Sequence, residues 1–232
     1  MTPQTVLITG AGRGIGRAAA IELASAGYQI VLLARNEPEL AETARLAGDG
    51  LVLPTDVTDS GQIDAAIART IQTYQRLDAI VHCAGLAPIL AIDATSNEQW
   101  RAVLDTNLSA AFYLCRAAWP HFKRQKSGVV VNISSEASRD PFAGFAAYGA
   151  AKAGLNLFGR SAAREGHPFN ITVHTLAPSA VETAMFRQIA TPEQYPADKT
   201  LTPADVARVI LQCVRGDLRH TSGEVIYLHR TV

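Results

Sequence analysis

The chain has 232 residues, 48% of them hydrophobic, and its 21 acidic and 21 basic side chains give a formal net charge of +0. This length and apolar content fit one α/β domain with a large core, spanning residues 1–232. The balanced charge supplies no basic field for nucleic acid. The sequence has no apolar run of about 18 residues and no basic leader, so we expect a cytoplasmic protein with no membrane partner.

The chain opens with the pattern of a strand, a turn and a helix. Residues 5–9, TVLIT, are typical of a buried strand, and residues 15–26 are typical of a helix. The turn between them holds Gly10, Gly12 and Gly14, and Gly16 follows in the first turn of the helix. Glycines there let a pyrophosphate approach backbone N–H groups at a helix N-terminus, where the dipole favours negative charge. The turn therefore indicates a dinucleotide site, with a plain structural turn as the alternative.

The second apolar run, residues 29–34, ends at Ala34 and is followed by Arg35. A carboxylate at this point would bind the adenosine ribose hydroxyls of NAD and repel a 2′-phosphate, and Ala34 is not a carboxylate. Arg13 in the glycine turn supplies a second guanidinium, and guanidinium forks suit phosphate. The two arginines favour NADP(H), unless both are solvated surface side chains.

Further apolar runs alternate with helical stretches along the rest of the chain. They lie at residues 51–54, 78–82, 128–133, 170–176 and 224–228. Ser96 and Thr202 begin segments with the composition of helix starts, and a proline follows Thr202 at the first helical position. This alternation predicts a parallel sheet with helices on both faces. No repeat or linker divides the chain.

Ser135, Tyr148 and Lys152 are the candidate catalytic residues. Ser135 follows the strand-like run 128–133, and residues at the carboxyl ends of parallel strands line clefts. Tyr148 and Lys152 are four residues apart in a helical stretch, which places both side chains on one face. A free phenol has a pKa of about 10, and a positive neighbour favours the phenolate. The pattern suits a proton-transfer site, whereas a surface tyrosine–lysine pair is the alternative.

These motifs, in this order, closely resemble the short-chain dehydrogenase/reductase family over nearly the whole chain. The resemblance implies a Rossmann-type, doubly wound sheet of seven parallel strands and an oxidoreductase that interconverts a carbonyl and an alcohol with NADP(H). It implies cofactor contacts from Gly10, Gly12, Arg13, Gly14, Ile15, Gly16, Arg35, Asp56, Val57, Ala84, Gly85, Tyr148, Lys152, Pro178, Val181 and Thr183. Asp56 would contact the adenine.

The resemblance also implies catalytic roles for four residues. Tyr148 would exchange its phenolic proton with the substrate oxygen, and the positive charge of Lys152 would favour the phenolate. Ser135 would hydrogen-bond the substrate oxygen and hold it near the hydride path. Asn107 would hold a water in a proton relay from Lys152, although the sequence alone leaves it an ordinary helical asparagine.

The chain departs from the family pattern at several positions near the expected nicotinamide pocket. His82 and Cys83 stand where two asparagines are usual, Ser179 replaces a common glycine, and Glu136 follows the catalytic serine in place of a small residue. The C-terminal segment from Gly223 lacks the Asp-Gly-Gly ending of many members. We expect these changes to affect substrate choice and reaction rate more than cofactor binding.

The substrate is left open by the sequence. Residues 182–201 would form the lid in this family. Their apolar side chains suggest as substrate a ketone or aldehyde of modest size that is partly apolar, with simple core packing as the alternative; these side chains are Met185, Phe186, Ile189 and Tyr195. The second hypothesis is a 3-oxoacyl-[acyl-carrier-protein] reductase whose Arg124, Lys126 and Arg187 meet an acidic carrier. A hypothesis of another class is a non-catalytic NADPH sensor or scaffold on the same fold.

The remaining expectations concern metals, thiols and assembly. The three cysteines have no metal-ligand spacing and no paired framework, and the six histidines are scattered, so we assign no metal and no disulfide. The family resemblance implies a homodimer or homotetramer that pairs helices around residues 98–124 and 147–164. Small residues at 150, 151, 153 and 154 would permit close helix contact.

Overall fold

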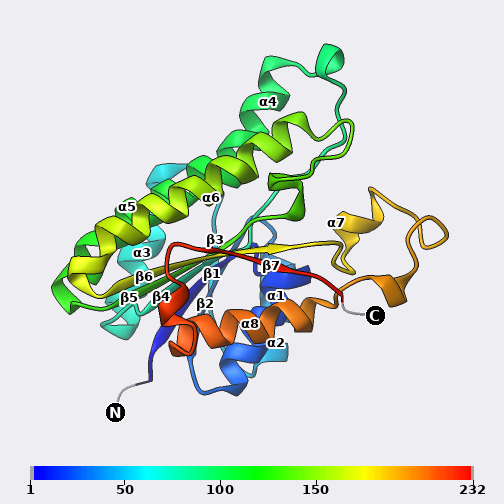
Figure 1. The fold of residues 1–232 in the computed structure, drawn as a ribbon. Helices are drawn as coiled ribbons and strands as arrows, with labels where there is room; N and C mark the ends of the chain where they lie inside the picture. Colours follow the sequence, from blue (N-terminus) through cyan, green and yellow to red (C-terminus); the bar gives the residue numbers. More distant parts are fainter. Residues whose placement is uncertain (1–2, 231–232) are drawn as a thin grey trace.

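The computed structural model describes residues 3–230, and its centre is a parallel sheet of seven strands (Figure 1). The strands are β1 Thr5–Thr9, β2 Gln29–Ala34, β3 Leu51–Pro54, β4 Ala79–His82, β5 Gly128–Ile133, β6 Ile171–Pro178 and β7 Val225–Leu228. Their order across the sheet is β3-β2-β1-β4-β5-β6-β7, and every neighbouring pair is parallel. The predicted doubly wound, Rossmann-type α/β sheet is confirmed.

Helices cover both faces of this sheet. They are α1 Gly14–Ser25, α2 Glu37–Ala47, α3 Ser60–Tyr74, α4 Asn97–Leu104, α5 Ala110–Gln125, α6 Ala146–Gly166, α7 Ala184–Arg187 and α8 Pro203–Arg215. One hydrophobic core lies between the sheet and α1, α2 and α8, and a second lies between the sheet and α3, α5 and α6 (Figure 1). Within the described residues, no helix is both long and apolar enough to cross a membrane.

The apolar strands serve these two cores alternately. Val6 and Ile8 of β1 point into one core and Leu7 into the other, and all three side chains are fully buried. Successive side chains of a strand face opposite sides of a sheet, so a strand covered on both faces is apolar throughout. This is why the sheet strands read as short continuous hydrophobic runs.

Two helix starts follow directly from their first residues. Ser96 caps α4, with its hydroxyl accepting a hydrogen bond from the Gln99 N–H and the Gln99 side chain accepting one from the Ser96 N–H. Thr202 caps α8 through a reciprocal pair with Asp205, and Pro203 is the first helical residue. Such capping boxes satisfy amides that have no partner within the helix. Both predicted helix starts are confirmed.

The helix expected around residues 98–124 is interrupted. After α4, residues Asp105–Ser109 form a π-helical turn, and α5 begins at Ala110. A π-turn inserts one residue into the helical register, and such turns occur frequently at functional sites. This one contains Asn107, which is fully buried.

Candidate active site

A cavity of about 1660 Å³ opens at the carboxyl edge of the sheet, where the segments that follow β1 and β4 face each other. The chain leaves β1 toward β2 on one side and later returns as β4 on the other, so the connecting loops diverge at this boundary. Pockets for drug-sized ligands measure about 300–1,000 Å³. This cavity therefore has room for a dinucleotide together with a small second molecule.

The glycine turn forms one wall of the cavity and leaves no space for side chains. Gly10 has a φ of +63°, and a Cβ there would lie 2.8 Å from the Ala84 nitrogen. A Cβ at Gly16 would lie 2.3 Å from the Gly10 carbonyl oxygen. The helix α1 starts after Arg13 without any capping side chain, so its first amides face the cavity uncapped. An uncapped helix N-terminus beside close backbone suits a pyrophosphate.

The opposite wall is built from β4, β6 and their following residues. A Cβ at Gly85 would lie 3.1 Å from Asn107 Oδ1, and a Cβ at Gly14 would lie 3.3 Å from Thr183 Cγ2. The turn and the segment after β6 therefore approach each other across the cavity. The glycine turn and the facing segments after β4 and β6 fit an extended dinucleotide, because glycines and small side chains leave room for it between them.

At the outer end of the cavity lie the residues that the sequence assigns to the adenosine. Arg13 and Arg35 are exposed and line this end, and their contact with a 2′-phosphate stays a prediction. Asp56 also lines it, and its carboxylate accepts hydrogen bonds from the N–H and the hydroxyl of Thr58 at 2.9 and 2.8 Å. Val57 beside it is buried and borders the cavity.

Glu39 is a feature of this end that the sequence reasoning missed. It lies on α2, and its Oε2 would be 2.9 Å from a Cβ built on Gly12. That Cβ would also lie 3.8 Å from the Cβ of Ala34, where the sequence had shown no carboxylate. A carboxylate from α2 therefore reaches the position that the end of β2 leaves neutral. No signal in the local sequence pattern reveals this contact, because it depends on how α2 packs against the glycine turn.

Ser135, Tyr148 and Lys152 all line the inner end of the cavity. Ser135 begins the 3₁₀ turn Glu136–Ser138 after β5, and its hydroxyl accepts a hydrogen bond from the Ala137 N–H at 3.2 Å. Lys152 is 3% exposed, and its Nζ donates a 2.8 Å hydrogen bond to the Ile133 carbonyl. The same Nζ lies 5.6 Å from the centre of the Tyr148 ring. The strand end thus fixes the lysine beneath the tyrosine.

The charge state of this group is set mainly by burial. Burial raises the pKa of the Tyr148 hydroxyl above its ordinary value, and a hydrogen bond with Ser135 acts in the lowering direction. Burial lowers the pKa of Lys152 to about 8. The phenol is therefore protonated at neutral pH and is ready to donate a proton. The sequence predicted that the positive charges of Lys152 and of an oxidised nicotinamide favour the phenolate, and this stays a prediction.

Asn107 lies behind the cavity wall and does not line it. Its Nδ2 donates hydrogen bonds to the carbonyls of Val103 at 2.9 Å and Leu86 at 2.8 Å. Its Oδ1 accepts from the Leu86 N–H at 3.4 Å. The π-turn directs this amide toward the segment after β4, so the asparagine braces that segment rather than acting as an ordinary helical residue.

The residues that depart from the family pattern are accommodated in the structure. His82 is buried, its Nδ1 is 2.9 Å from the Thr9 hydroxyl, and this contact ties β4 to β1 at the cavity. Burial lowers the pKa of His82 to about 3, so the ring is neutral. Cys83 lines the cavity, and burial raises its pKa to about 12, so its thiol stays protonated at neutral pH. Ser179 donates its N–H to the Leu228 carbonyl at 2.9 Å.

Two side chains beside Ser135 point away from the reacting groups. The Ser134 hydroxyl donates to Asn156 Oδ1 at 2.6 Å on α6, as its alternation on the strand predicts. Glu136 pairs with Arg139 at 2.7 Å, and its other oxygen lies 3.5 Å from His229 Nε2. The acidic residue that follows Ser135 is thus tied to the residue after β7.

The cavity gathers residues that lie far apart in the chain. Every residue assigned to the cofactor by sequence lines it, as do Ser135, Tyr148 and Lys152. Among the described residues, no group of three or more His, Cys, Asp or Glu side chains could hold a metal ion. All three cysteines are free thiols.

A doubly wound parallel sheet with a glycine turn at its switch point defines the class of dinucleotide-binding α/β proteins. The family model described as short chain dehydrogenase matches residues 4–194. The chain therefore belongs to the short-chain dehydrogenase/reductase family of oxidoreductases, and the resemblance seen in the sequence is confirmed.

Similar proteins cover most of the chain. A 3-oxoacyl-[acyl-carrier-protein] reductase of Synechocystis is 33% identical over 80% of this chain and 77% of its own length. The 3-oxoacyl-[acyl-carrier-protein] reductase FabG of Escherichia coli K12 is 30% identical over 96% of this chain and 94% of its own. The solved structure of gox2181 has a TM-score of 0.91 at 27% identity, covering 98% of this chain and 95% of its own.

Proposed function

We propose that the chain is an NADP(H)-dependent oxidoreductase that interconverts a carbonyl and an alcohol, working as a single domain with Tyr148 as the general acid and base. The observation that carries the proposal is one continuous cavity with the glycine turn at one end and Ser135, Tyr148 and Lys152 at the other. This arrangement brings a bound nicotinamide and a proton donor to the same substrate carbonyl. When bound, the nicotinamide supplies the hydride that reduces the carbonyl carbon.

The chain's own groups bind the cofactor and move the proton. The uncapped N-terminus of α1 would hold the pyrophosphate, beside Thr183 in the segment after β6. Tyr148 donates its phenolic proton to the oxygen of the reduced substrate, and Ser135 orients that oxygen by hydrogen bonding. Lys152, fixed on the Ile133 carbonyl, places its positive charge beneath the phenol ring. A phenol with a raised pKa is protonated at neutral pH and can donate its proton, whereas the reverse reaction needs the phenolate.

At the adenosine end, two arginines support NADP(H) binding and the carboxylate of Glu39 opposes it. Arg13 and Arg35 offer two guanidinium groups to a 2′-phosphate. Glu39 adds a carboxylate next to Gly12, which repels a 2′-phosphate and can accept hydrogen bonds from ribose hydroxyls. Arg13 and Arg35 favour NADPH, and the carboxylate of Glu39 beside Gly12 opposes that preference.

Reduction of 3-oxoacyl groups on acyl carrier protein is the second candidate, because the two curated relatives named above carry that activity. The charge around the cavity weighs against an acidic carrier. Glu98, Asp105 and Asp140 line the substrate end against Arg101. Arg124 and Lys126 lie at the end of α5, next to the amino end of β5, and so at the edge of the sheet opposite the cavity.

Turnover of a carbonyl panel with NADPH tests the proposed function. We expect ketones or aldehydes with apolar substituents to be reduced, and a 3-oxoacyl group to be reduced at least as well on a small thioester as on acyl carrier protein. A strong preference for the carrier-bound form would instead establish the second candidate. A chain that binds NADPH and turns over no carbonyl would behave as a sensor or scaffold.

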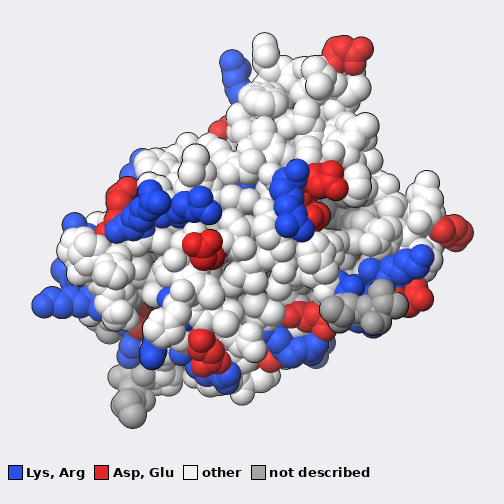
Figure 2. Space-filling view, in the orientation of Figure 1, with Lys and Arg blue, Asp and Glu red and all other residues white. Residues whose placement is uncertain are grey.

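We further infer a homodimer or homotetramer that uses α5 and α6. Phe112 on α5 and Leu157 on α6 are 47% and 68% exposed, and Phe158 packs edge-on against Phe112 with ring centres 6.4 Å apart. Figure 2 shows acidic and basic side chains interspersed over one face of the molecule, with no single-signed patch on it. Of the small residues expected at the contact, Ala151 is fully buried within its own chain, whereas Ala150 and Ala153 are exposed.

Light scattering at micromolar concentration should give a mass at least twice the 24.7 kDa of one chain. Leu157→Arg should shift the protein toward the single-chain mass, because a charge would be buried in an apolar contact. Leu46→Arg is the matched control, since Leu46 is 42% exposed on α2, away from α5 and α6. A wild-type protein that remains at the single-chain mass would refute the assembly.

A further inference from the structure

The segment between β6 and α8 leaves the body of the protein as a loop closed at its base. The Glu182 N–H donates to the Leu201 carbonyl at 2.8 Å, and the Leu201 N–H donates to the Ala180 carbonyl at 2.9 Å. Beyond this base, residues 183–200 form the short helix α7 and an irregular return, which project from the sheet (Figure 1). The shape of this segment depends on contacts within it.

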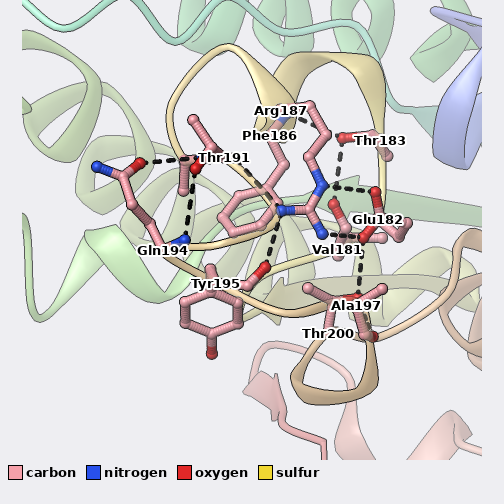
Figure 3. Close-up of polar contacts among 11 residues, drawn as sticks. Val181, Glu182, Thr183, Phe186, Arg187, Thr191, Gln194, Tyr195, Ala197 and Thr200 are labelled. Atoms are coloured by element: carbon pink, nitrogen blue, oxygen red, sulfur yellow. Dashed lines mark hydrogen bonds and ion pairs between the residues drawn. The ribbon is translucent and has the colours of Figure 1, made fainter.

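Arg187 is the centre of those contacts (Figure 3). Its guanidinium donates from Nε to Glu182 Oε1 at 2.7 Å and from Nη2 to Glu182 Oε2. The third nitrogen, Nη1, donates to the Tyr195 carbonyl at 2.8 Å and the Ala190 carbonyl at 3.3 Å. One side chain therefore joins the base of the segment to two points on its far side.

This arrangement depends on the shape of arginine. A guanidinium holds its N–H donors in a rigid planar fork, whereas a lysine ammonium is a single point charge on a flexible stem. The Arg187 side chain is 19% exposed and that of Glu182 is 35% exposed. The ion pair lowers the pKa of Glu182 and raises that of Arg187, so both groups stay charged at neutral pH.

The neighbours of Arg187 line the cavity, whereas Arg187 and Glu182 lie outside its lining. Phe186, Ile189 and Tyr195 form this wall, and the rings of Phe186 and Tyr195 meet edge to face with centres 5.4 Å apart. Arg187 also lies over the Phe186 ring, 5.3 Å from its centre. The guanidinium thus holds an apolar wall from behind without contacting the cavity.

Two further aromatic side chains of the cavity, Phe142 and Phe145, form a row of rings that ends at Tyr148. Phe142 and Phe145 have ring centres 5.8 Å apart, and Phe145 and Tyr148 have ring centres 5.3 Å apart. Phe142, Phe145 and Tyr148 line the same cavity as the wall on residues 186–195. A substrate carbonyl at Tyr148 would therefore carry its substituent between these two apolar sets of side chains, beside the acidic side chains and Arg101 that also line this end.

We propose that Arg187 is a positioning residue that sets substrate specificity, because its bonds to Glu182, Ala190 and Tyr195 hold the apolar wall that selects carbonyl compounds with a bulky apolar substituent. The proposal rests on the proposed carbonyl reduction and adds to it the substrate class and the residue that enforces it. A small ketone fills little of this space and gains little from the wall. A bulky apolar ketone loses contact area when the wall becomes mobile.

Hydrogen exchange tests the positioning role without any turnover. In Arg187→Met, backbone amides of residues 188–196 should exchange about tenfold faster than in the wild type, while the amides of the sheet are unchanged. Arg187→Lys should fall between the two, because it keeps the charge and loses the fork. Arg208→Met is the matched control, since Arg208 pairs with Asp205 on the exposed side of α8. Unchanged exchange in residues 188–196 of Arg187→Met would overturn the proposal.

Kinetics with two ketones tests the specificity role. For 1-tetralone, a bulky bicyclic aryl ketone, Arg187→Met should raise KM about tenfold with kcat nearly kept, because ground-state contacts are lost. For butanone, both constants should stay within about twofold of the wild type. Equal losses for the two ketones would indicate a general structural effect and overturn the specificity role. A wild type that reduces neither ketone would contradict the proposed function, and the exchange measurement would then decide the ordering role alone.

Discussion

Replacing Tyr148 with phenylalanine is expected to lower carbonyl turnover by at least about 100-fold, the lower end of what a positioned general acid contributes. The substitution removes one oxygen and keeps the ring, which packs 5.3 Å from Phe145 between ring centres. NADPH affinity should change little, because the glycine turn and its amides are untouched. Steady-state kinetics and a fluorescence titration with NADPH measure the two quantities separately.

Two companion variants separate the roles of the neighbouring groups. Ser135→Ala should lower turnover with NADPH affinity largely kept, because Ser135 orients the substrate oxygen. Lys152→Ala should lower turnover and also weaken NADPH binding. It removes the buried positive charge beneath the phenol and leaves the Ile133 carbonyl without its 2.8 Å donor. A Tyr148→Phe protein that reduces a confirmed substrate at near the wild-type rate would remove Tyr148 from the mechanism.

The wild type should bind NADPH at least about tenfold more tightly than NADH, a difference of about 1.4 kcal/mol. Arg35→Ala should reduce this ratio, because it removes one guanidinium from the adenosine end of the cavity. Combining it with Ala34→Asp should turn the preference toward NADH, since a carboxylate at the end of β2 accepts hydrogen bonds from the ribose hydroxyls. Fluorescence titration with each dinucleotide gives both dissociation constants.

Glu39→Gln should change the same ratio in the opposite direction and raise the NADPH preference. The amide keeps the size of the side chain beside Gly12 and removes its negative charge. Glu37→Gln is the matched control, because Glu37 also borders the cavity from the first turn of α2 but does not approach Gly12. Equal affinities for the two dinucleotides in the wild type, or an NADH preference that survives Arg35→Ala, would contradict the NADP(H) assignment.

The fold and the two ends of the cavity were predictable because their signals are local. A glycine turn between a strand and a helix, and a tyrosine four residues before a lysine, keep their meaning wherever the rest of the chain packs. Strands buried on both faces are continuously apolar, so even their order along the chain was readable as alternation with helices.

The contacts between elements were not predictable in the same way. Glu39 meets Gly12 only because α2 packs beside the glycine turn, and Arg187 meets the Tyr195 carbonyl only after an irregular segment folds back on itself. The π-turn at Asn107 leaves no periodicity signal, because it adds a single residue to an otherwise continuous helical pattern. Each of these depends on tertiary packing, which no window of sequence contains.

The strand order across the sheet would make the proposed cofactor and substrate specificities independently adjustable. Arg35 follows β2 and the apolar wall of Phe186 and Tyr195 follows β6, and β1, β4 and β5 lie between them. At the usual spacing of neighbouring strands, this separation is roughly 19 Å. Substitutions farther apart than about 7–10 Å, with no shared partners, have free-energy effects that add. Changes that exchange the cofactor and changes that exchange the substrate can therefore be combined in one chain, each keeping the effect it has alone.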